Sequence, residues 1–396
     1  MGVAQRMETV MFSAKRLMRL RTVLEQRVES GAVPGVLAVL ARRGEVHVEA
    51  VGSLAFDGGS TAMATDTIVR MASMSKPIVA ACAMTLIEDC TLRLDDPVDD
   101  LVPELASMRV LADPAGPVED TVAAARPITV RDVLAFTLGT GMVPAETPIS
   151  DALDTVRGRD LDEWVARLGK VPLVHQPGER WMYETGSDVT GVLIQRATGK
   201  SFGTALRERI LEPLGMKDTG FSVEARNFDR FATAYEQEDG PDGAVVEDVP
   251  ETGRWSAPPV LEDGGGGLVS TAEDYLAFAS AMLAGGRYQG TQVLSRAAVT
   301  LMTSDQLTPE QRAVSGFWPG YFATTSWGFG TGIVTDRTRL GPSAGSYGWT
   351  GFYGTAWYND PAEELTGILI QQRAHAGDAR LAFARDFWTT VYQSLT

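Results

Sequence analysis

A serine and a lysine three residues apart lie where an extended run meets a long apolar helix. The stretch TIVRMASMSKPIVAACAMTLIEDC, residues 67–90, places Ser73 and Lys76 just before that helix. Side chains three residues apart share a helix face, so these two can meet. A serine hydroxyl needs a neighbouring base, and a lysine can be that base if partial burial and nearby positive charge lower its pKa. The start of the helix adds N–H groups that suit an oxyanion.

Two other interpretations compete with this one. Ser73 can simply cap the helix while Lys76 extends toward solvent, because two fixed residues make a short motif. The segment GPSAG around Ser343 matches the G-x-S-x-G elbow, which needs a strand before it, a helix after it and a histidine further on. A proline precedes Ser343, a loop and strand pattern follows it, and His375 comes too soon afterwards. We therefore favour Ser73 as the nucleophile.

Strand patterns occur at both ends of the chain, where they could build one sheet. Residues 33–52 predict two strands around a turn at 42–44, and residues 347–372 predict paired strands by their alternation. Helical patterns accompany them at 13–30, which stops before Gly31, and at 379–395.

Helical patterns dominate the middle of the chain. Residues 77–89 predict a buried helix, and a second helix is expected from its cap Thr129 to Gly139. Residues 236–266 are rich in Gly, Pro, Asp and Glu and are expected to form a loop, with GGGG at its end allowing backbone to approach the active site. A capping box from Ser270 to Glu273 predicts another helix, closed by two glycines.

This order of elements predicts an α+β fold with an antiparallel sheet flanked by helices. Residues 1–90 and 265–396 are expected to form a discontinuous α/β domain, and residues 91–264 a mostly helical domain inserted between them. The active site is expected at their interface.

Composition and charge narrow the kinds of partner. The chain of 396 residues has 44% hydrophobic and 22% charged residues and a net charge of −16, so nucleic acid and anionic membranes are unfavourable partners. Cys82 and Cys90 are too far apart on one helix for a disulfide, and three scattered histidines predict no metal site. No signal peptide is evident at the start, so a cytoplasmic location is expected.

Two later segments extend the motif that begins at Ser73. Tyr183 follows a Pro-Gly turn in HQPGERWMYETGSD, and the triplet Trp349-Thr350-Gly351 lies in GSYGWTGFYGT near the end of the chain. In this order and spacing the chain resembles S-x-x-K serine hydrolases, namely class C β-lactamases, penicillin-binding proteins and, most of all, family VIII carboxylesterases. The stretches LEPLGMKDTGF and GGGGLVSTAEDY add to the resemblance, which runs from about residue 15 to the end.

The resemblance implies a role for each matching residue. Ser73 would be the acylated nucleophile, and Lys76 and Tyr183 would share proton transfer, with the choice of base left open. The backbone N–H groups of Ser73 and Phe352 would form the oxyanion hole. No cofactor and no metal are implied.

Two departures from the β-lactamase pattern favour a neutral ester as substrate. Thr185 replaces an asparagine, and Trp349 replaces the lysine or histidine that would meet a lactam carboxylate. The residues expected to contact substrate are Trp349, Thr350, Gly351, Thr185 and Tyr353. Further aromatic residues could line an acyl pocket: Trp181, Trp327 and Trp357.

The expected activity is hydrolysis of a small-molecule, short-chain carboxylic ester through an acyl-enzyme on Ser73. A β-lactamase or D,D-peptidase, and an amide hydrolase or acyltransferase on the same scaffold, remain alternatives. The alternative that is not an enzyme is a catalytically silent binding protein of this fold. The natural ester and the oligomeric state do not follow from the sequence.

Overall fold

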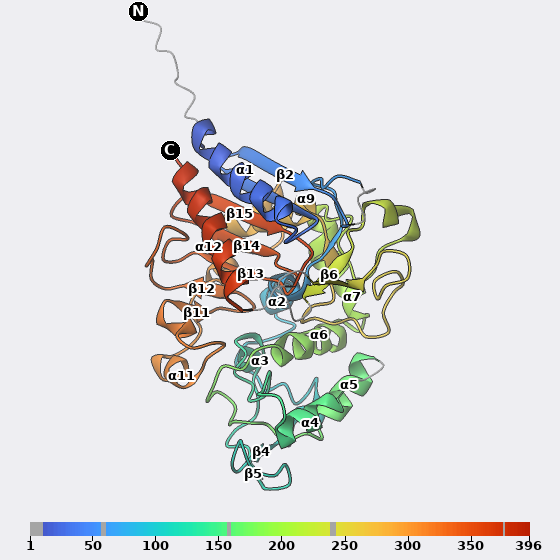
Figure 1. Cartoon of the computed structure of the whole chain (residues 1–396). Coiled ribbons are helices and arrows are strands. Elements are labelled where there is room, and N and C mark those ends of the chain that lie inside the picture. The colour runs from blue at the N-terminus through green and yellow to red at the C-terminus, as the bar shows by residue number, and fades with distance from the viewer. Residues whose placement is uncertain (1–10, 57–60, 157–159, 238–242, 375–376) are drawn as a thin grey trace, which may run out of the picture.

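One antiparallel sheet contains strands from both ends of the chain (Figure 1). The computed structural model describes residues 11–56, 61–156, 160–237, 243–374 and 377–396, so His375 lies outside the described residues. The sheet order is β11-β12-β13-β14-β15-β1-β2, and Leu37 of β1 pairs with Ile370 of β15. The strands are β1 (Gly35–Arg42), β2 (Glu45–Gly52), β11 (Thr325–Trp327), β12 (Gly332–Val334), β13 (Tyr347–Thr350), β14 (Ala356–Asp360) and β15 (Leu365–Ile370). The expected α+β fold is confirmed.

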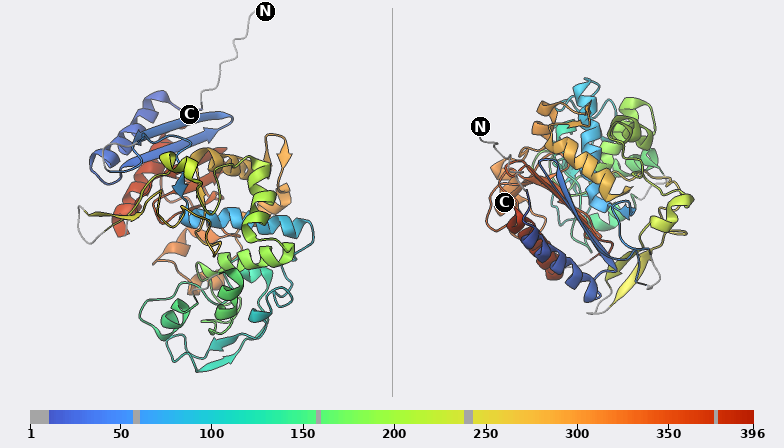
Figure 2. Two further views of the ribbon diagram at one scale, coloured as in Figure 1. Left: turned by 90° about the vertical axis from the view of Figure 1, so that its right-hand side faces the viewer. Right: turned by 90° about the horizontal axis from the view of Figure 1, so that it is seen from above.

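Helices cover both faces of this sheet. The terminal helices α1 (Ala14–Glu29) and α12 (Gly377–Ser394) lie together on one face, while α9 (Ala272–Leu283) and α2 (Ser75–Glu88) lie on the other (Figure 2). The first pair closes a separate apolar core in which Leu20 and Leu24 pack with Phe387. The second pair belongs to the main core. The sheet is therefore a rigid platform between the two cores, and β13 can hold a side chain in place beside α2.

The middle of the chain is mostly helical, and its part from β4 to α6 lies below the sheet in Figure 1. Helix α6 packs against α2 and joins this region to the rest of the molecule. The domain boundaries at 91 and 264 stay a prediction. The elements of the region are η2 (Pro103–Leu105), β4 (Arg109–Leu111), β5 (Thr121–Ala123), α3 (Val130–Leu134), α4 (Pro148–Asp154), α5 (Leu161–Leu168), α6 (Thr185–Thr198), α7 (Phe202–Leu206), η3 (Arg207–Leu211), α8 (Glu212–Leu214) and η4 (Ala225–Arg230).

Three helix boundaries differ from those expected. Helix α2 begins at Ser75 rather than residue 77, because Pro77 fits the first turn of a helix. Helix α3 has the expected Thr129 cap but ends at Leu134, since Phe136 has a φ of 62° that a helix cannot continue through. Helix α9 is capped by Thr271 rather than by a box starting one residue earlier.

Residues 236–266 are not the continuous loop that the sequence suggested. Strand β6 (Ala234–Gln237) pairs with β7 (Ala244–Asp248), so the expectation was wrong for this part of the segment. Two consecutive valines in β7 have the branched side chains that favour strands. The short strands β3 (Val69–Arg70) and β8 (Val269–Ser270) also pair. The remaining elements are η1 (Ala72–Met74), β9 (Arg287–Tyr288), β10 (Thr291–Gln292), α10 (Arg296–Met302), α11 (Pro309–Val314) and η5 (Tyr321–Ala323).

A buried ion pair ties β7 to the strand that leads into Ser73. Arg70 is fully buried, its Nε donates to Asp248 Oδ1 at 2.8 Å, and its guanidinium lies over the Phe231 ring at 4.0 Å. This pair fixes the start of the segment that carries the nucleophile.

We expect Asp248→Ala to lower the free energy of unfolding by about 3 kcal/mol, because it leaves the buried Arg70 charge without its partner. Urea unfolding followed by circular dichroism measures the change. Asp95→Ala is the control: Asp95 pairs with Arg131 at a site where its side chain is 77% exposed. Asp95→Ala should lower the free energy of unfolding by less than about 1 kcal/mol. Equal losses in the two variants would contradict a special role for the buried pair.

None of the helices in the described parts of the chain is both long and apolar enough to cross a membrane.

Candidate active site

Ser73 lies in the 3-10 turn η1, directly before α2, and is half-buried. The preceding residue, Ala72, has a φ of 46°, a backbone conformation that residues other than glycine rarely adopt. Lys76 lies in the first turn of α2 and is buried, and its Nζ donates to Ser73 Oγ at 3.0 Å. The spacing of these two residues therefore produces the expected contact between their side chains.

Tyr183 and Trp349 reach the same point from distant parts of the chain. The Lys76 Nζ lies 4.6 Å from the centroid of the Tyr183 ring. Trp349, on β13, donates its indole N–H to the Tyr183 hydroxyl oxygen at 2.6 Å. The structure thus brings Ser73, Lys76, Tyr183 and Trp349 together, from η1, α2, the segment before α6 and the sheet.

The surroundings of Lys76 decide the direction in which its pKa is shifted. Burial alone lowers the pKa of Lys76, but the phenol oxygen of Tyr183 and the carboxylate of Glu184 outweigh it, and the pKa is raised above its ordinary value. Lys76 Nζ donates to Glu184 Oε1 at 2.9 Å and to the carbonyl oxygen of Gly265 at 2.6 Å. The condition under which Lys76 itself would act as the base, a lowered pKa, is not met here, because acceptors rather than cations surround its Nζ.

Tyr183 is buried, and burial is the largest cause that raises the pKa of its hydroxyl. The Lys76 ammonium opposes this rise, Glu184 adds to it, and hydrogen bonds with Ser73 and Trp349 favour the ionised form. The phenol oxygen thus contacts the hydroxyl of Ser73 and accepts from the Trp349 indole N–H, while the Lys76 ammonium lies over the ring; these neighbours would stabilise a phenolate. This environment lets Tyr183 exchange a proton with Ser73.

The turn after β13 lies against the backbone that precedes Ser73. A β-carbon at Gly351 would come within 2.4 Å of the Met71 carbonyl oxygen, so only glycine permits this approach. The Gly351 N–H donates to the Thr355 carbonyl oxygen at 2.8 Å, which closes the turn that contains Phe352. Phe352 is half exposed. The oxyanion hole from Ser73 and Phe352 stays a prediction that this proximity favours.

An aromatic cluster surrounds the side of Tyr183 away from Lys76. Its members are Phe136, Trp181, Tyr183, Leu307, Tyr321, Trp327 and Trp349, with Phe317 and Phe322 at the edge. Trp349 is buried here, with its ring centroid 4.5 Å from that of Trp327 and 5.6 Å from that of Tyr183. Its contact with substrate stays a prediction, whereas its contact with Tyr183 is direct.

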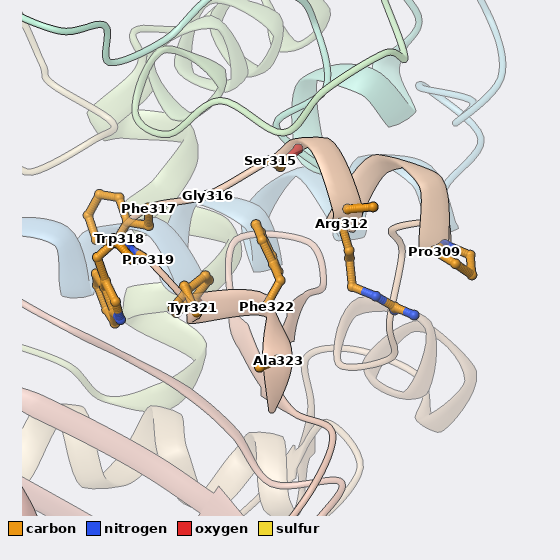
Figure 3. A pocket seen from close by; sticks show the side chains of 12 residues that line it. Pro309, Arg312, Ser315, Gly316, Phe317, Trp318, Pro319, Tyr321, Phe322 and Ala323 are labelled. Atoms are coloured by element: carbon orange, nitrogen blue, oxygen red, sulfur yellow. The ribbon is translucent and has the colours of Figure 1, made fainter.

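A cavity of about 660 Å³ lies beside this cluster (Figure 3). Helix α11 and the loop after it line the cavity, which includes Arg312, Phe317, Trp318 and Tyr321. The Phe317 ring centroid is 4.6 Å from that of Tyr183, so one ring separates the cavity from the candidate proton-transfer residue. Four of its twelve lining residues are aromatic, and Arg312 and Ser315 add polar groups, so the wall is of mixed character.

The other residues expected to contact substrate have different surroundings. Thr185 begins α6 and Thr350 ends β13, and both are half-buried. Tyr353 packs against Ala72, and its hydroxyl donates to Glu247 at 2.9 Å. The three further aromatic residues lie in two places. Trp181 and Trp327 belong to the aromatic cluster, whereas Trp357 is buried in the main core and cannot line an acyl pocket there.

Ser343, the rival nucleophile, lies in a different environment. Its backbone N–H donates to Asp360 Oδ2 at 2.9 Å, and its hydroxyl accepts from Arg337 at 3.3 Å. A loop and then strand β13 follow it, rather than a helix. The elbow that a serine of that class needs is therefore absent from this described segment.

The sequence interpretation missed Glu184, which follows Tyr183 and binds Lys76 with both carboxylate oxygens, at 2.9 and 3.1 Å. Its position directly after Tyr183 in the sequence could have indicated that it lies near the candidate site. In the GGGG segment, the Gly265 carbonyl oxygen accepts from Lys76, so the backbone of this segment does come close to the candidate site. In the described residues no group of three or more His, Cys, Asp and Glu side chains could hold a metal.

Comparison with known proteins identifies the class to which this fold and site belong. A family model described as Beta-lactamase matches residues 20–387. The chain therefore belongs to the β-lactamase family of serine hydrolases, as its motifs and fold indicated.

Its relatives in that family include an esterase. Protein Rv1367c of Mycobacterium tuberculosis is 37% identical over 91% of this chain and 89% of its own length. Esterase EstB of Burkholderia gladioli is 31% identical, with 91% of each chain covered. The structure of EstCE1, described as a hydrolase with promiscuous acyltransferase activity, superposes with a TM-score of 0.78 at 23% identity, covering 95% of this chain and 98% of that one. At that identity the structural likeness supports the fold alone.

Proposed function

We propose that this protein is a carboxylesterase that cleaves short-chain esters through an acyl-enzyme on Ser73. The observation that carries the proposal is the convergence of Ser73, Lys76 and Tyr183, with Lys76 Nζ 3.0 Å from Ser73 Oγ and Tyr183 held by the neutral indole of Trp349. A relative described as an esterase supports the same activity.

The proposed reaction has two balanced steps. The Lys76–Tyr183 pair reacts in the form that has lost one proton, which the ammonium of Lys76 and the indole N–H of Trp349 help to stabilise. In that form the pair accepts the proton of the Ser73 hydroxyl while the serine oxygen bonds to the ester carbonyl carbon. The carbonyl oxygen carries the negative charge until the bond to the alcohol breaks, and the alcohol leaves with the proton from the pair. A water molecule then attacks the acyl group in the same way, and Ser73 recovers its proton when the acid leaves.

The residue at position 349 favours a neutral substrate over a lactam. Its indole N–H is already directed to Tyr183 at 2.6 Å, and an indole cannot form an ion pair with a carboxylate. A lactam carboxylate would therefore enter without a partner at this position. The desolvation of that charge costs free energy, whereas a neutral ester has no such cost.

We expect esters of about C2 to C6 acyl length to be cleaved with kcat/KM at least about 10²-fold above that of a cephalosporin, a difference of roughly 2.7 kcal/mol. One preparation is assayed with p-nitrophenyl butyrate and with a chromogenic cephalosporin. Trp349→Phe is a useful companion variant, because it keeps an aromatic ring while removing the donor to Tyr183. If the parent hydrolyses the cephalosporin as efficiently as the ester, the lactamase alternative replaces this proposal.

A further inference from the structure

Three residues accept hydrogen bonds from the side-chain nitrogen of Lys76. Its Nζ donates to Ser73 Oγ at 3.0 Å, to the Glu184 carboxylate at 2.9 Å and to the Gly265 carbonyl oxygen at 2.6 Å. An ammonium group carries three donors and no acceptor, so all three contacts are satisfied. A neutral amine could still accept from the Ser73 hydroxyl, which is both a donor and an acceptor, but it would lose the ion pair with the Glu184 carboxylate. The Glu184 carboxylate is therefore the neighbour that favours the charged form.

Two features of the backbone, a strained conformation at Glu184 and a glycine at position 265, hold the Glu184 carboxylate against Lys76. Glu184 has a φ of 92°, a region that residues with a β-carbon seldom occupy, and it directly precedes α6. A β-carbon at Gly265 would lie 2.4 Å from Glu184 Oε1, so the glycine leaves the space that this carboxylate fills. Two backbone features thus keep one carboxylate against Lys76. Such strain at an unusual φ is characteristic of functional sites.

Of the acidic groups that the structure describes around Lys76, Glu184 is the one that forms an ion pair with it. Asp188 of α6 is buried, and burial first and the Asp263 carboxylate second raise its pKa well above its ordinary value, which favours the neutral form. Asp263 Oδ1 accepts from the Gly265 N–H at 2.7 Å, so its oxygen is directed to the backbone. Tyr183 faces Lys76 with its ring. Glu184 is then the carboxylate that forms the ion pair with Lys76.

We propose that Glu184 is a positioning residue whose carboxylate holds Lys76 as an ammonium against Ser73 and thereby sets the pH range in which the Lys76–Tyr183 pair exchanges protons. This role rests on the proposed function, in which that pair moves the serine proton. Glu184 touches neither the ester nor the attacking oxygen and acts through Lys76.

The sign of the effect follows from the charge. A negative charge favours the protonated form of a neighbour, and Glu184 raises the pKa of both Lys76 and Tyr183. The two limbs of a pH profile belong to the coupled pair rather than to either residue. Removing the carboxylate should move both limbs to lower pH by about one unit, because the side chain is partly exposed and its field is screened. A purely structural role would lower the rate without moving either limb.

The experiment measures the rate at which a fluorophosphonate labels Ser73 from about pH 5 to about pH 11 in the parent, Glu184→Gln and Glu184→Gly. Glutamine keeps the shape without the charge, and glycine also relieves the positive φ, so it should fold even if glutamine does not. Glu224→Gln is the control, since Glu224 pairs with Arg226 on the surface. We expect both midpoints to fall in the Glu184 variants and to stay unchanged in the control.

Unchanged or raised midpoints in folded Glu184 variants would overturn the proposal, as would a folded variant that is not labelled at any pH. An unlabelled parent would instead overturn the proposed function. In that case the ultraviolet titration of Tyr183 in a Ser73→Ala background, isolated by subtracting the Tyr183→Phe spectrum, still decides the role of Glu184. The tyrosinate signal should appear at lower pH when Glu184 is replaced, and an identical titration would refute the coupling.

Discussion

Ser73→Ala is expected to lower kcat for p-nitrophenyl butyrate by about 10⁴-fold or more and to abolish labelling by a fluorophosphonate. The hydroxyl is the group that Lys76 and Tyr183 contact, and an alanine leaves no oxygen to form the acyl-enzyme. The loss should appear in kcat, because the residues beside the substrate are unchanged. Steady-state kinetics and intact-mass spectrometry together measure it.

Ser343→Ala is the matched control, since it removes the same hydroxyl from the rival motif. In the described part of the chain, the Ser343 hydroxyl contacts Arg337 and Asp360 rather than a lysine or a tyrosine. This variant should retain near-parental turnover and full labelling. Labelling that persists in Ser73→Ala, or that maps to the peptide containing Ser343, would show that the nucleophile has been assigned to the wrong serine.

The parts of the fold that the sequence predicted are those where local pattern and packing agree. The hairpin of β1 and β2 has a strand that is buried almost throughout followed by one that alternates, and α2 is buried on nearly all sides. The cap at Thr129 forms as expected, with Asp132 completing the box. At these places the tertiary structure strengthens what the local residues already favour.

The predictions failed where tertiary contacts override local preference. Strand β7 lies in a segment of loop-like composition, yet Asp248 at its end is fixed by a fully buried arginine from β3. The charge of Lys76 could not be inferred because Glu184 and Gly265 reach it from remote segments. The spacing of Ser73, Lys76 and Tyr183 can be read from the sequence. The electrostatic field around them cannot, because it depends on which oxygens the fold brings near.

Lys76→Met is expected to lower kcat on an unactivated short-chain ester by about 10³-fold, with a smaller change in KM. Methionine fills much of the space of the lysine stem but supplies no donor to Ser73 and no positive charge beside Tyr183. Both contacts act on the proton that moves in the reaction, so their loss affects the transition state more than the bound ester. An activated ester would mask the effect, because its leaving group needs little proton donation.

Lys200→Met provides the control, since it makes the same change at an exposed lysine that pairs with Glu208. It should leave turnover unaltered. Tyr183→Phe should lower kcat by a factor similar to that of Lys76→Met. The double variant should lose no more than about a further tenfold in kcat, because the effects of two groups that move one proton together are not additive. Fully additive losses would mean that the two residues act on separate steps. Near-normal turnover in Lys76→Met would mean that the contact with Ser73 is structural and that Tyr183 needs no cation beside it.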